Sequence, residues 1–62
     1  MNQNIKIAEQ VRRASIESGD YLMRSACDRL LVAIKNHQYY IGHLRDYTLI
    51  VDMWTFLEAE KP

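Results

Sequence analysis

The chain has 62 residues, 48% of them hydrophobic, and its eight basic and eight acidic side chains give a formal net charge of zero. This length allows one small domain, and the balanced charge argues against a nucleic-acid-binding arm. The charge is slightly uneven, because residues 1–35 carry six basic and four acidic groups and residues 36–62 carry two and four. Antiparallel or head-to-tail association of two copies is one use for that difference.

Cysteine usage and the N-terminal sequence indicate the compartment. Cys27 is the single cysteine, so no disulfide forms within the chain, and one Cys with two His gives no metal-ligand spacing. No cofactor or metal is expected. The segment MNQNIKIAEQ lacks a signal-peptide pattern, and no uncharged run approaches the roughly 20 residues that span a bilayer. We therefore expect a cytoplasmic protein with no membrane association.

A chain this short is only marginally stable by itself. Folding should bury about 6,400 Å² of surface. The hydrophobic gain of about 95 kcal/mol then nearly equals the ordering cost of about 93 kcal/mol. Regular helix packing and self-association remain as the sources of extra stability.

Residues 4–18 predict a first helix, with Asn4 as its N-cap. Its buried stripe follows alternate steps of four and three residues: Ile7, Val11, Ala14 and Ser18. Polar residues fill the opposite side, so the buried seam is narrow. The next residues mark a turn, since Gly19 can adopt the left-handed conformation after a helix and Asp20 can cap the following one. So short a connection predicts a helical hairpin.

The second helix is predicted over residues 20–36, and it is unusually apolar. One face carries Met23, Ala26, Cys27, Leu30, Ala33 and Ile34, and further apolar groups lie beyond it at Leu22, Leu31 and Val32. A helix this apolar needs cover from more than one neighbour. We expect it to end near Asn36, although the apolar spacing also allows it to continue to Ile41 with Gly42 as the stop.

A third helix is predicted over residues 43–60, starting as early as Tyr39. Its stripe comprises Tyr40, Leu44, Tyr47, Val51 and Trp54, extended by Ile50, Met53 and Leu57. The rival is a β-hairpin of residues 39–41 and 47–51 around Gly42, because both segments are rich in β-formers. Helix is favoured, since the apolar spacing continues past Val51.

The residues able to do chemistry do not form a catalytic pattern. Cys27 lies in mid-helix, where a buried structural thiol is expected rather than a nucleophile. His37 and His43 have no third ligand nearby and are expected to be solvated or capping. Capping and solvation also account for the carboxylates: Asp20, Asp28, Asp46 and Asp52. We therefore expect no enzymatic activity.

Four arginines are the candidates for a nucleic-acid contact: Arg12, Arg13, Arg24 and Arg29. A helix-turn-helix would place the start of the second helix in a major groove. Asp20 leads that helix and would repel phosphate. DNA or RNA binding is therefore the alternative function and not the preferred one.

The aromatic residues suggest a contact surface. The candidates for protein binding crowd the C-terminal third: Tyr39, Tyr40, Tyr47, Trp54 and Phe56. A core this small cannot easily bury them all, and Tyr and Trp are enriched at interface hot spots. Core packing explains Tyr47 and Trp54 well but Phe56 less well, because Phe56 lies off the main stripe.

Together these patterns predict an all-α fold, a helical hairpin plus a third helix, with residues 1–62 as a single domain and with Leu30, Ile34 and Val51 in the core. Self-association as a two-fold dimer is expected. The expected function is non-catalytic protein binding by a regulator or inhibitor. Its size and class are those of many small bacterial and phage regulators.

Overall fold

The structure is a computed structural model that describes residues 2–36 and 41–61, with side chains described for residues 3–36 and 45–61. Three helices pack together: α1 (Asn2–Ser18), α2 (Tyr21–Lys35) and α3 (Ile41–Ala59). The predicted all-α three-helix unit is confirmed. Within the described ranges, no helix is long and apolar enough to cross a bilayer.

The alternative secondary structures are wrong. Residues 47–51 lie within α3, which excludes the β-hairpin, although Tyr39 and Tyr40 of its other arm lie outside the described residues. The longer second helix is also wrong, because α2 ends at Lys35 and the Asn36 amide donates to the Val32 and Ile34 carbonyls at its C-cap.

The start of the first helix differs from the sequence prediction. α1 begins at Asn2, so Asn4 lies in its first turn and is not the N-cap. An exposed helix end can satisfy its free amides with water, so no capping side chain is required there. The Asn4 side chain instead accepts a hydrogen bond from the Tyr47 hydroxyl at 3.4 Å. α3 begins at Ile41, between the two predicted starts at Tyr39 and residue 43, and Gly42 lies in its first turn.

The turn between α1 and α2 follows the prediction closely. Gly19 has φ +78°, and its amide donates to the Ile16 carbonyl at 3.4 Å while the Asp20 amide donates to the Ser15 carbonyl at 2.9 Å. This is the Schellman pattern of helix termination. The Asp20 carboxylate then accepts from the Met23 amide at 3.1 Å and caps α2. The hairpin is confirmed.

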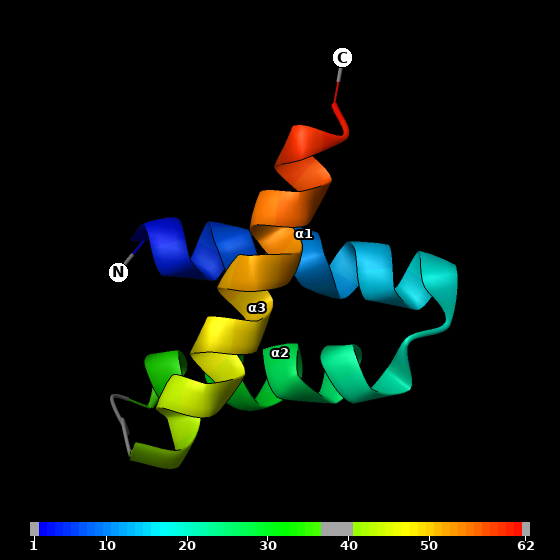
Figure 1. The fold of residues 1–62 in the computed structure, drawn as a ribbon. Helices are drawn as coiled ribbons and strands as arrows, with labels where there is room; N and C mark the ends of the chain where they lie inside the picture. The colour runs from blue at the N-terminus through cyan, green and yellow to red at the C-terminus, as the bar shows by residue number, and fades with distance from the viewer. Residues whose placement is uncertain (1, 37–40, 62) are drawn as a thin grey trace.

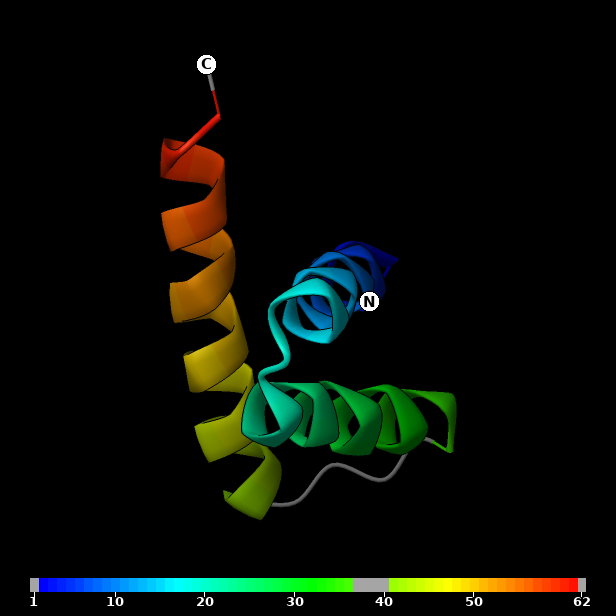
Figure 2. The same cartoon turned by 90° about the vertical axis from the view of Figure 1, so that its right-hand side faces the viewer.

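The third helix lies across the hairpin instead of alongside it. In Figure 1, α1 and α2 run side by side and α3 crosses in front of both, with its C-terminal end extending past α1. Figure 2 shows that both hairpin helices lie on the same side of α3. The opposite side of α3 has no described neighbour.

The core lies between the hairpin and α3. Its buried residues are Ile7, Ala8, Val11, Ala26, Cys27, Leu30, Ile34 and Ile50. The predicted inner face of α2 is confirmed, since all of its members are buried except Met23, which is half-buried. Leu30 and Ile34 are therefore core residues, as expected.

The buried stripes of α1 and α3 are shifted from the predicted ones. Ser15 is buried and bonds the Val11 carbonyl at 2.8 Å, whereas Ser18 is exposed. Val51 was predicted to be core but is only half-buried, and its neighbour Ile50 is fully buried instead. The reason is that α3 crosses the hairpin at an angle. The row of α3 side chains that is buried therefore differs from the row that would be buried if the three helices were aligned.

Candidate functional site

A bidentate ion pair joins α2 to α3. The Arg29 Nε donates to Asp46 Oδ2 at 2.9 Å and Nη2 donates to Oδ1 at 3.1 Å. The Asp46 side chain is only 12% exposed, whereas that of Arg29 is 57% exposed. The hydrogen bonds and the carboxylate charge raise the pKa of Arg29 above its usual value. The expectation of a solvated or capping Asp46 is therefore wrong, because the residue lies on the inner side of α3.

A second carboxylate engages two more arginines on the hairpin. Asp28 Oδ1 lies 2.6 Å from the Arg12 Nε, and its Oδ2 lies 3.9 Å from the Arg24 Nε. Three of the four candidate nucleic-acid arginines are thus paired with carboxylates. Arg13 is exposed and has no ion pair within the described part of the chain.

The Cys27 thiol is fully buried, as predicted. Burial, with a further contribution from the Asp28 charge, raises its pKa to about 11. A nucleophilic cysteine needs the opposite shift. Among the described residues, no group of three His, Cys, Asp or Glu side chains is placed to hold a metal ion. The side chains of His37 and His43 lie outside the described residues.

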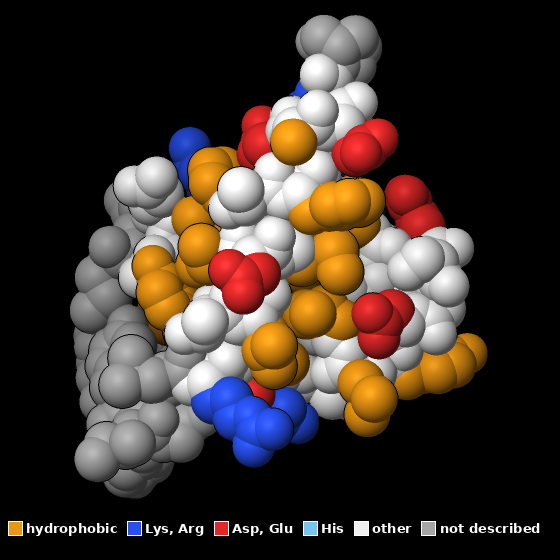
Figure 3. Space-filling model, in the orientation of Figure 1, with side chains coloured by type: hydrophobic (Ala, Val, Ile, Leu, Met, Phe, Trp, Pro, Cys, Tyr) orange, Lys and Arg blue, Asp and Glu red, His pale blue; other side chains and the backbone are white. Residues whose placement is uncertain are grey.

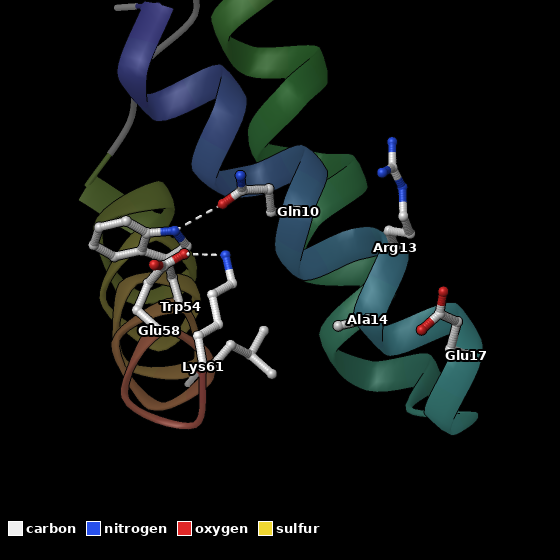
Figure 4. Close-up of a pocket in the computed structure, with 8 residues that line it drawn as sticks. Gln10, Arg13, Ala14, Glu17, Trp54, Glu58 and Lys61 are labelled. Atoms are coloured by element: carbon white, nitrogen blue, oxygen red, sulfur yellow. Dashed lines mark hydrogen bonds and ion pairs between the residues drawn. The ribbon is translucent and has the colours of Figure 1, made fainter.

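An open groove of about 330 Å³ runs between α1 and the C-terminal half of α3 (Figure 4). Trp54 lies at one wall, and its indole Nε1 donates to the Gln10 Oε1 at 2.8 Å. Beside it, the Lys61 ammonium lies 2.8 Å from the Glu58 carboxylate. The polar groups of this groove therefore mostly satisfy one another.

A larger groove, of about 590 Å³, separates the start of α2 from the middle of α3. Leu22 and Leu49 stand at its wall with 86% and 46% of their surface exposed. The Arg29–Asp46 pair and Arg45 also line it. The groove thus combines exposed leucines with an arginine-rich edge.

From this groove an apolar surface continues along α3. Leu49, Met53 and Phe56 follow steps of four and three, so they lie on one side of the helix. Phe56 is 59% exposed. We call Leu22, Leu49, Met53 and Phe56 the outer strip. Figure 3 shows hydrophobic side chains gathered along α3 with basic side chains at the lower end of the same face.

The structure separates the predicted aromatic contact residues into three groups. Tyr39 and Tyr40 lie outside the described residues. Tyr47 and Trp54 pack against the core and bond to α1, so they help to hold α3 in place. Phe56 alone of the described members is mostly exposed.

Three members of the outer strip were missing from the predicted contact residues, and one of them, Met53, was predicted as part of the buried stripe. Leu22 was noted only as an apolar residue beyond the inner face of α2, and Leu49 received no role. A detectable signal was present, since Leu49 precedes Phe56 by seven residues and both lie off the predicted Tyr47–Val51–Trp54 stripe. Without the crossing angle of α3, that spacing did not reveal which stripe faces outward.

Comparison with known protein families, with curated proteins and with solved structures gives no match to this chain.

Proposed function

We propose that this protein is a non-catalytic protein-binding module, a regulator or inhibitor in the cytoplasm that self-associates as a homodimer and docks the outer strip of a dissociated copy onto a target protein. The observation that carries the proposal is the exposure of Leu49 and Phe56 on α3, with 46% and 59% of their surface in contact with solvent. Scattered exposed hydrophobic residues are normal, but exposed hydrophobic residues that gather on one surface usually mark a contact surface.

The total exposed surface supports the proposal. The chain exposes 4771 Å². A compact monomer of 7.3 kDa is expected to expose about 4,200 Å². The excess is consistent with a helix that keeps one side uncovered. Association with another polypeptide would remove apolar surface of this kind from water.

The described arginines give less support to nucleic-acid binding. Asp28 and Asp46 neutralise Arg12, Arg24 and Arg29 in part, and Asp20 stands at the start of α2. Binding to duplex DNA depends on unpaired cations that displace counterions. Retention on heparin at low salt therefore serves in the test below to distinguish nucleic-acid binding from protein binding.

The test is capture of a target protein by matched variants of the full chain. The immobilised wild type is compared with Phe56→Gln and with Val32→Gln, a control at a similarly exposed residue of α2. Val32 lines a groove formed by α1 and α2, away from the outer strip. Glutamine is a good helix former, so both variants should keep the fold.

We expect a protein that the wild type and Val32→Gln retain and that Phe56→Gln loses. Retention by all three baits, or loss with Val32→Gln alone, would contradict docking through the outer strip. Salt-sensitive retention on heparin without any Phe56-dependent protein would favour the nucleic-acid alternative.

A further inference from the structure

We propose that α3 pairs antiparallel with α3 of a second copy of this chain, so that Arg45 of each copy contacts the partner's Asp52. This deepens the proposed function and rests on it, because it specifies how the homodimer forms: a second copy covers the outer strip and so competes with the target protein for that surface. The inference comes from a row of residues on α3 that is exposed, regularly spaced and self-complementary in charge.

The row follows steps of four, three and four residues: Arg45, Leu49, Asp52 and Phe56. Steps of this kind form the seam between paired helices. All four residues are exposed, and they lie about 100° to 160° around the helix axis from the buried Ile50. Both hairpin helices pack on one side of α3 in Figure 2, so a second helix can approach the row, with Leu22 of α2 at the edge of the contact.

The charges of the row select one direction of pairing. Arg45 and Asp52 have no ion pair with any described residue. Parallel pairing would place each charge against the same charge of the second copy. An antiparallel pair centred on Asp52 would also bring two carboxylates together. Centring the pair between residues 48 and 49 instead makes Arg45 level with the partner's Asp52.

A two-fold axis repeats that contact, so the dimer contains the ion pair twice. Seven residues, or about 10.5 Å of helix, separate the two charges in each copy. In this register Leu49 meets the partner's Leu49 at the axis. Phe56 falls level with residue 41, where the partner's α3 begins.

The leucines and phenylalanines supply the affinity, while the charges set the direction and register. Exposed ion pairs add little net binding free energy, but like charges placed opposite each other discriminate strongly against wrong pairings. Leu22 stands beside Leu49 in the α2–α3 groove and extends the apolar contact onto α2. One helix pair is a small interface, so we expect a dissociation constant on the order of micromolar or weaker.

The test is sedimentation equilibrium of the full chain from micromolar to near-millimolar concentration. Arg45→Asp and Asp52→Arg should each weaken the dimer about tenfold, because each replaces two attractions by two repulsions. An equimolar mixture of these two variants should recover the wild-type affinity to within about threefold, and so should the double variant Arg45→Asp/Asp52→Arg. Arg13→Asp, at an exposed arginine of α1, is the control and should leave the dimer unchanged.

Circular dichroism checks that each variant keeps its helices, which is expected because none of the three sites is buried. A wild type that stays monomeric throughout, or single variants that dimerise as well as the wild type, would overturn the pairing. A monomer that still captures a target through Phe56 would overturn the pairing while leaving the binding module intact. A charge-dependent dimer that captures no target would support the pairing and overturn the binding module.

Discussion

Arg29 and Asp46 join α2 to α3 through two parallel hydrogen bonds, at 2.9 and 3.1 Å, with the carboxylate on the buried side and the guanidinium on the solvent side. The pair fixes where the middle of α3 meets the hairpin. The pair also lines the α2–α3 groove at which the outer strip begins.

Removing this carboxylate should weaken the fold. Asp46→Ala leaves Arg29 without its bidentate partner, and we expect a loss of about 1–3 kcal/mol in the free energy of unfolding, measured by urea denaturation. Glu9→Ala, at an exposed carboxylate of α1 outside the proposed dimer contact, is the control and should change stability by less than about 0.5 kcal/mol. Equal effects from the two variants would show that the ion pair does not hold α3 in place.

Cys27 predicts an alkaline loss of stability. Its pKa is raised from 9.0 to about 11 by burial, so the folded state keeps the thiol protonated after the unfolded state has lost its proton. The protonated thiol therefore makes its full contribution to the free energy of unfolding below pH 9. As the pH rises from 9 toward 11, the free energy of unfolding falls by up to about 2 kcal/mol. Unfolding of the wild type and of Cys27→Ala at pH 8 and pH 11 measures it. The stability difference between them should shrink at the higher pH, and a constant difference would contradict the assignment.

Gly19 should resist substitution for reasons of backbone conformation alone. Its φ is +78°, and a Cβ added there would meet no atom within 4 Å. Gly19→Ala is therefore expected to lower the thermal unfolding midpoint through a cost of about 1 kcal/mol. Gly19→Asn should cost less, because Asn tolerates the left-handed region better. If both substitutions proved neutral, the turn would not depend on this conformation.

The outer strip and the core should respond differently to truncation. Phe56→Ala removes a mostly exposed ring and should change the free energy of unfolding of the monomer by less than about 1 kcal/mol, whereas Leu30→Ala should cost about 2–5 kcal/mol. Chemical denaturation at low micromolar concentration, with helicity followed by circular dichroism, makes the comparison. A Phe56→Ala variant as unstable as Leu30→Ala would show that the ring belongs to the core.

Several features of this protein were readable from the sequence because they depend on local chemistry. Gly19 and Asp20 specify the turn through backbone conformation and capping, which involve only adjacent residues. The prediction that the apolar face around Leu30 and Cys27 is buried was also correct. Both α1 and α3 pack against α2, and its most apolar face is directed toward them.

Tertiary packing decided what the periodic pattern left open. On α3, Ile50 and Val51 belong to neighbouring rows that are equally apolar, and only the crossing angle over the hairpin buries the first and leaves the second half-exposed. The same angle turned Asp46 inward to Arg29 and Phe56 outward. A helix with apolar residues on most sides does not encode which side is buried, so the position of the contact surface depends on how α3 packs against its neighbours.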